Sequence, residues 1–132
     1  MVDALRRAHA AVRPRGWVVD LHPTAVPASI QVGASTTGEV EAADAPQRHA
    51  HADAALAAAI ADRLFAVDRT VEFTFFTYGD TLDELHDYIV ENWRNARLGE
   101  ETLRRTREAL RAAPGTRPRA REQVRATRLR VC

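Results

Sequence analysis

The sequence predicts a small α/β (α+β) protein, with a mixed, mainly antiparallel sheet of three to five strands packed by three to four helices. Its 132 residues are 45% hydrophobic, which suits a single domain over residues 1–132. Apolar residues recur at helical spacing in some segments and alternate in others, as in amphipathic helices and strands. Pro- and Gly-containing turns separate these segments, so each predicted element has clear limits.

The first predicted elements are a helix over residues 2–12 and a strand over residues 16–23. The helix has an apolar stripe formed by Val2, Leu5, His9 and Val12. Pro14 and Gly16 end it and turn the chain. In the strand GWVVDLHP, alternation places Trp17, Val19 and Leu21 on one face and Val18 on the other.

A hairpin and a second helix are expected next. Weak alternation around a Gly- and Thr-rich centre predicts that Ser29–Val32 pairs with Glu39–Ala42. Asp44 followed by Pro46 is a good helix start, and this helix is predicted to run to about Leu64. Its apolar stripe consists of Leu56, Ala59, Ile60 and Leu64.

The segment TVEFTFFTYGD, residues 70–80, is the strongest predicted strand. Apolar side chains occupy both of its faces, with Val71, Phe73 and Phe75 on one and Phe76 and Tyr78 on the other. A strand that is apolar on both sides is expected in the interior of a sheet, where both faces are covered.

Two helices and a strand complete the prediction. TLDE at 81–84 is a capping box, and it precedes a core stripe of Leu82, Leu85, Ile89 and Trp93. A helix over about 100–112 carries Leu103 and Leu110. The segment 123–131 alternates apolar or small residues with arginines, so it is expected to be a strand with one solvated face; the two sets are Thr127, Leu129 and Val131 against Arg128 and Arg130.

This order of elements resembles the C-terminal half of class I S-adenosylmethionine-dependent methyltransferases. ALRRAHAAVRPRGWVVDL is similar to that family's leucine/arginine helix, its "RPGG" turn and its fifth strand. EFTFFTYGDTLDELHDYI and VRATRLRV are similar to its sixth and seventh strands with a neighbouring helix. The resemblance implies a shared fold over most of the chain.

The same resemblance implies that the cofactor site is missing. In the family, S-adenosylmethionine binds a glycine-rich turn after the first strand and an acidic residue after the second. This chain has no GxGxG and its six glycines are scattered, so no cofactor-binding residue can be assigned and no cofactor is expected. S-adenosylmethionine stays possible only through the family resemblance.

The expected role is therefore that of a non-catalytic homodimeric domain related to methyltransferases, with a structural or partner-binding function. One alternative is a methyltransferase whose cofactor site needs another chain. Another is a small-ligand or metal-binding protein. Without a neighbouring fourth strand, the strand at 17–21 would keep unpaired amides and an apolar surface, which pairing with a second copy would cover. The predicted dimer edge consists of Trp17, Val18, Val19 and Leu21.

Two clusters are weak candidates for chemistry. Asp20 could orient His22 as a general base near the end of a strand, although a strand-end polar pair at a turn is the favoured interpretation. In HAHAD, His49, His51 and Asp53 could contribute to a metal site. Two histidines and one carboxylate are few ligands, so a solvent-facing start of a helix is the alternative and no metal is assigned.

Charge and hydropathy narrow the classes of partner. Residues 104–132 carry ten arginines and two glutamates, whereas residues 1–103 carry nine arginines and 16 carboxylates. An arginine-rich segment can contact phosphates, but this one contains no aromatic residue to stack on bases, so nucleic-acid binding is not expected. No apolar run is long enough to cross a membrane and no signal peptide is recognised, which predicts a cytoplasmic protein. A protein partner is possible.

Overall fold

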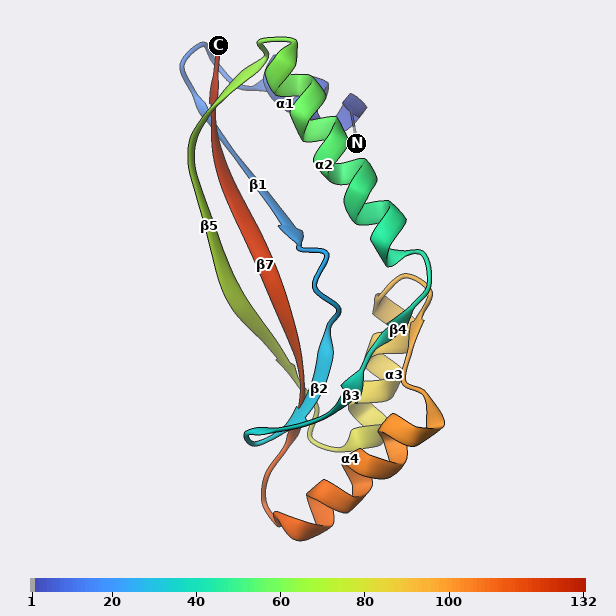
Figure 1. The fold of residues 1–132 in the computed structure, drawn as a ribbon. Coiled ribbons are helices and arrows are strands. Elements are labelled where there is room, and N and C mark those ends of the chain that lie inside the picture. The colour runs from blue at the N-terminus through green and yellow to red at the C-terminus, as the bar shows by residue number, and fades with distance from the viewer. Residues whose placement is uncertain (1) are drawn as a thin grey trace. The chain divides into compact units, whose positions relative to one another are not determined.

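The structure, a computed structural model, describes residues 2–132 and confirms the predicted fold class: four helices and a mainly antiparallel sheet lie in this part of the chain (Figure 1). In chain order the elements are α1 (Val2–Ala11), β1 (Trp17–Pro23), β2 (Ser29–Val32), β3 (Ser35–Glu39), β4 (Glu41–Ala42), α2 (Ala45–Ala61), β5 (Phe65–Tyr78), α3 (Leu82–Asn92), β6 (Ala96–Arg97), α4 (Glu100–Ala112) and β7 (Pro118–Val131). None of the helices formed by residues 2–132 has the length and apolar character needed to span a membrane.

The long strand β7 organises the main sheet. β1 pairs antiparallel with residues 124–130 of β7, and β2 pairs antiparallel with residues 118–121. β5 also pairs with β7, and β3 adds to the outer side of β2. β4 and β6 form a separate two-stranded ladder.

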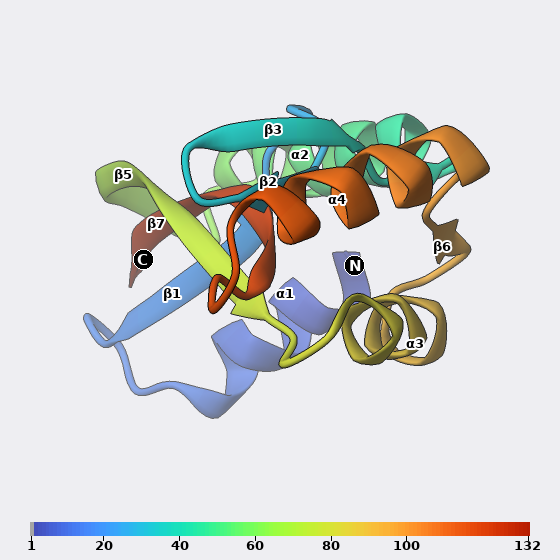
Figure 2. The same cartoon turned by 90° about the horizontal axis from the view of Figure 1, so that it is seen from below.

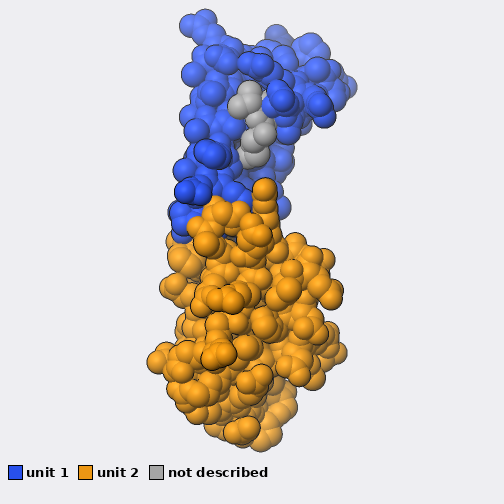
Figure 3. Space-filling model, turned by 90° about the vertical axis from the view of Figure 1, so that its right-hand side faces the viewer, with its two compact units in different colours: residues 1–25, 45–73, 124–132 blue, residues 26–44, 74–123 orange. Residues whose placement is uncertain are grey.

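The chain forms two compact units, each built from separate segments (Figure 3). Unit 1 comprises residues 1–25, 45–73 and 124–132, and unit 2 comprises residues 26–44 and 74–123. The strands β5 and β7 each contribute residues to both units.

In unit 1, α1 and α2 pack on one face of the strands β1, β7 and β5. The centre of this core consists of Leu5 from α1, Ala55 and Ala59 from α2, Phe65 from β5, and Leu129 and Val131 from β7. Alanines at 55 and 59 let the backbone of α2 approach its neighbours closely. The ring of His9 meets the ring of Phe65 edge-on, with their centroids 5.6 Å apart, so His9 lies against the core as its stripe predicts.

In unit 2, α3 and α4 cover β2, β3 and the first part of β7. The buried residues of this core are Ile30, Val40, Leu82, Leu85, Ile89, Ala96, Leu98 and Ala120. The Thr81 half of the predicted capping box is confirmed, because the Glu84 N–H donates to the Thr81 hydroxyl at 3.1 Å. α4 runs beside β3 (Figure 2), and Gly38 permits this approach because a Cβ there would lie 2.2 Å from the Thr102 hydroxyl.

Two sequence-based expectations are wrong in detail. The partner of Ser29–Val32 is Ser35–Glu39, joined through a tight turn at Gly33, whose φ is +60°. Glu41–Ala42 pairs instead with Ala96–Arg97. The observed hairpin is joined by a two-residue turn, whereas the predicted one would need the longer Gly- and Thr-rich loop. Two-residue turns are the commonest connections between paired antiparallel strands.

The strand β5 is not the interior strand that its two apolar faces predict. It begins at Phe65, and its only partner among residues 2–132 is β7, so it lies at an edge of the sheet. Phe73 is 40% exposed and Phe75 is 52% exposed. Apolar composition shows what a strand could bury, but Phe73 and Phe75 remain largely exposed.

Candidate functional site

The polar cluster around His22 lies on the helix-covered face of unit 1. The Nδ1 atom of His22 lies 2.6 Å from the Asp20 Oδ2 atom, and its Nε2 atom lies 3.2 Å from the Asp53 Oδ1 atom. Asp20 and His22 are two residues apart on β1, so alternation places both side chains on one face. Asp53 comes from α2, which packs over that face.

Arg125 extends the cluster to the other strands of unit 1. It lies directly opposite His22 in the β1–β7 register. Its guanidinium donates to the Glu72 carboxylate on β5 at 3.0 Å and lies 3.8 Å from the Asp53 carboxylate. Four elements, β1, α2, β5 and β7, are therefore joined by charged side chains around His22.

The geometry around His22 supports a structural tie more directly than catalysis. A general base needs a ring nitrogen with a lone pair directed at a substrate. Both ring nitrogens of His22 instead face carboxylate oxygens, and the side chains of His22 and Asp20 are each only 12% exposed. Through these two contacts His22 joins β1 to α2.

The two histidines of HAHAD have different surroundings. His49 is half-buried, and its Nδ1 atom is enclosed without a hydrogen-bond partner in the described structure. His51 is exposed. Of the three candidate metal ligands, only Asp53 contacts His22, and no group of three or more His, Cys, Asp or Glu side chains within residues 2–132 is arranged to hold a metal ion.

The surroundings of His49 predict a dependence of stability on pH. Burial lowers its pKa from 6.5, the positive charges of Arg48 and His22 lower it further, and Asp53 partly opposes them. In the unfolded chain the ring binds a proton at higher pH than in the folded chain. The free energy of unfolding is therefore expected to fall as the pH drops below about 6.5, and to level off once the folded protein is also protonated.

Substitution tests this expectation. His49→Gln should lose less stability than the wild-type protein between about pH 7.5 and about pH 5.5, measured by urea unfolding at each pH. His51→Gln is the matched control, because this residue is exposed on the same helix, and it should keep the wild-type dependence. An identical pH dependence in all three proteins would contradict the assignment to His49.

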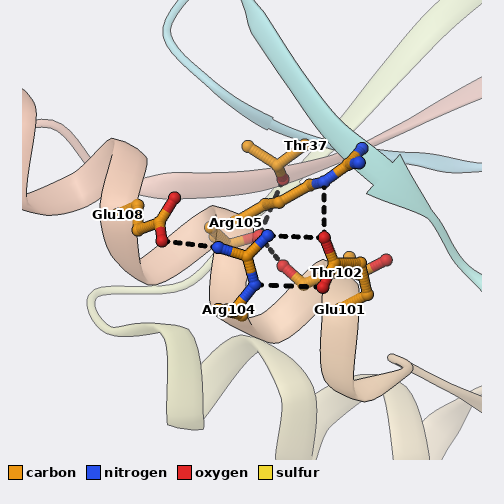
Figure 4. Close-up of polar contacts among 7 residues, drawn as sticks. Thr37, Glu101, Thr102, Arg104, Arg105 and Glu108 are labelled. Carbon is orange, nitrogen blue, oxygen red and sulfur yellow. Dashed lines mark hydrogen bonds and ion pairs between the residues drawn. The ribbon is translucent and has the colours of Figure 1, made fainter.

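A second polar cluster joins α4 to β3 in unit 2 (Figure 4). Glu101 accepts hydrogen bonds from Arg104 at 2.6 Å and Arg105 at 3.0 Å, and Arg104 also donates to Glu108. The bond from Arg104, above all, lowers the pKa of Glu101 to about 2. These pairs are exposed and contribute little to stability. Beneath them, the buried hydroxyls of Thr37 and Thr106 lie 2.7 Å apart and join the strand to the helix.

The turns after β1 and β5 do not fit a glycine-rich binding site for S-adenosylmethionine. Such a site needs a backbone turn open to the ligand after a strand. Gly79 follows β5, but a Cβ there would lie 2.7 Å from Leu85, so this glycine makes room for α3. β1 ends at Pro23 without a glycine.

The face of unit 1 opposite the helices is open. In the β1–β7 register, Trp17 lies opposite Arg130, Val19 opposite Arg128 and Leu21 opposite Ala126. The three β1 side chains are 48%, 63% and 60% exposed, in that order. We call this surface the open face; it comprises Trp17, Val19, Leu21, Ala126, Arg128 and Arg130.

Two arginines of the open face stack on its tryptophan. The guanidinium carbons of Arg128 and Arg130 lie 4.8 and 5.9 Å from the centroid of the Trp17 ring. Arg128 also donates to Asp68 on β5 at 2.7 Å. Arg130 makes no ion pair with a carboxylate in the described part of the chain.

Part of these arrangements could be predicted from the sequence. The spacing of Asp20 and His22 indicated that pair, and the alternation of Arg128 and Arg130 indicated a solvated face. No local sequence pattern indicates that His22 contacts Asp53, 31 residues away, or that Trp17 lies opposite Arg130. Val18, counted with the dimer edge, belongs to β1 but packs against the helix-covered core.

Comparison with known proteins adds no relative: no family model, curated protein or solved structure matches this chain.

Proposed function

We propose that this chain is a non-catalytic domain that forms a homodimer through the outer edge of β1 and serves a structural or partner-binding role. We further propose that it is related to the C-terminal half of class I methyltransferases. The observation that carries the proposed dimer is the free edge of β1, with its row of exposed apolar side chains.

The hydrogen bonds of β1 indicate which of its amides face outward. The Val131 N–H donates to the Gly16 carbonyl at 2.9 Å, which is in register with the β1–β7 ladder. In an antiparallel ladder, hydrogen-bonded pairs alternate with pairs whose groups point to the other edge. The main-chain groups of Trp17, Val19 and Leu21 therefore point away from β7. β1 has no other partner strand within residues 2–132.

This edge is complementary to a second copy of itself. A twofold axis at Val19 places this residue opposite Val19 of the partner subunit, and Trp17 opposite Leu21 of the partner subunit. Each of these antiparallel pairs then exchanges both main-chain hydrogen bonds, so all outward amides from 17 to 21 are satisfied. The cross-strand neighbours on the open face are all apolar, and no like charges oppose each other.

Two features support a role without catalysis. Both nitrogens of His22 are held by carboxylates, and the turn after β5 is filled by Leu85. The unpaired edge of β1 and its exposed apolar side chains instead form an interaction surface, as expected of a domain that binds a partner.

The first test is the mass of the protein in solution, measured by sedimentation or light scattering. The wild-type protein is expected at twice the chain mass of 14.7 kDa. Val19→Lys should be monomeric, because it places two ammonium groups together at the twofold axis. Val67→Lys is the matched control, since this valine is 48% exposed on β5 and lies outside the proposed interface.

A wild-type monomer, or a Val19→Lys protein that keeps the dimer mass, would refute the β1 dimer. Calorimetric titration of the same sample with S-adenosylmethionine tests the absence of a cofactor site separately. We expect no heat of binding. Micromolar binding would overturn the non-catalytic role and leave the mass result intact.

A further inference from the structure

We propose that the open face of unit 1 binds single-stranded nucleic acid, with Trp17 stacking on a base and Arg130 contacting the phosphate backbone. Proteins that bind single strands combine exposed aromatic rings with cationic side chains along one surface. The arginine-rich sequence after residue 103 has no aromatic residue of its own. β1 supplies one, because Trp17 lies directly opposite Arg130.

The charges of unit 1 are distributed in a way that suits an anionic ligand. Unit 1 has ten arginines and six carboxylates, a net charge of +4, whereas unit 2 has nine arginines and 12 carboxylates, a net charge of −3. Within unit 1, Asp20, Asp53 and Glu72 belong to the His22 cluster on the helix-covered face. Arg128 of the open face pairs with the Asp68 carboxylate on β5.

A second aromatic ring of unit 1 is exposed on β5, where Phe73 is 40% exposed. Val19 and Leu21 add apolar contact area for sugars and base edges beside Trp17.

The open face is compatible with the proposed dimer. Pairing two β1 strands edge to edge brings their side chains beside each other but keeps the two open faces on the same side of the extended sheet, so their outward surface stays accessible. Nucleic-acid binding therefore does not depend on the dimer, and the two proposals can fail separately.

The test is fluorescence anisotropy with a labelled single-stranded oligonucleotide of mixed sequence and about 12 nucleotides, within the usual site sizes. Binding is expected for the wild-type protein, with quenching of tryptophan emission. Trp17→Ala should weaken binding by about 5- to 150-fold, the loss typical of one stacked base. Trp17→Phe keeps a ring and should retain most of the affinity.

Salt dependence tests the contribution of the arginine. Arg130→Ala should weaken binding and lower the slope of log affinity against log salt by about 0.7, as for one lost phosphate contact to a single strand. Arg107→Ala removes the same charge from α4 in unit 2 and should change neither quantity. Circular dichroism of each variant confirms that it is folded.

Several results would overturn the proposal. One is the absence of oligonucleotide binding by folded wild-type protein. Another is equal binding by the wild-type and Trp17→Ala proteins. Duplex of the same sequence or inorganic polyphosphate binding as tightly as the single strand would show attraction to any polyanion, without the proposed stacking on Trp17.

Discussion

Replacing Leu129 with alanine is expected to lower the free energy of unfolding by about 2 to 5 kcal/mol. Leu129 has no exposed surface and lies in the unit 1 core with Phe65 and residues of both helices. Truncation removes its packing contacts and leaves a cavity. The cavity stays open because the pairing of β7 with β1 prevents the β7 backbone from moving in to fill it. Urea unfolding of the purified variant measures the loss.

Val67→Ala is the matched control for Leu129→Ala. Val67 also lies on a strand of unit 1 but is 48% exposed, so its truncation should cost no more than about 1 kcal/mol. Equal losses in the two variants would mean that Leu129 is not at the centre of a packed core.

Ile89→Ala is expected to have a comparable effect in unit 2, again about 2 to 5 kcal/mol. Ile89 is fully buried on α3 and packs with Leu82 and Leu85 in the unit 2 core. Alanine is the best helix former, so the loss would report packing and not the propensity of α3 to be helical. Thermal and urea unfolding of the variant give the change in stability.

The control for Ile89→Ala is its neighbour on the same helix. Val90 is 52% exposed, and Val90→Ala should be neutral or slightly stabilising because alanine favours the helix. If Val90→Ala destabilised the protein as much as Ile89→Ala, the buried face of α3 would be assigned to the wrong side.

The elements that could be predicted from sequence are those with a strong local signal. TLDE defined the start of α3, and the stripe of Leu82, Leu85 and Ile89 defined its buried face. The alternation of Leu129 with Arg128 and Arg130 predicted both faces of the last strand. In each case the spacing of residues close in sequence reflects the environment of the folded element.

The features that could not be predicted depend on pairings between distant segments. The aromatic strand β5 has apolar residues on both faces, but the sequence does not show whether other elements cover them. Asp53 reaches His22 only because α2 packs over β1, and Arg130 meets Trp17 only because the first and last strands pair. The sequence therefore predicts only part of each candidate site: Asp20 with His22 in one, and a basic segment without its aromatic partner in the other.

The central place of β7 has a consequence for how the chain reaches its fold. β7 comes later in the chain than β1, β2 and β5, the three strands that pair with it. During synthesis from the N-terminus, the edges and apolar faces of these strands remain exposed until β7 has been made. Such long-range pairing slows folding and leaves intermediates prone to aggregation. Recovery of folded protein is therefore expected to depend on chaperones that shield β1 and β5 until the last strand is available.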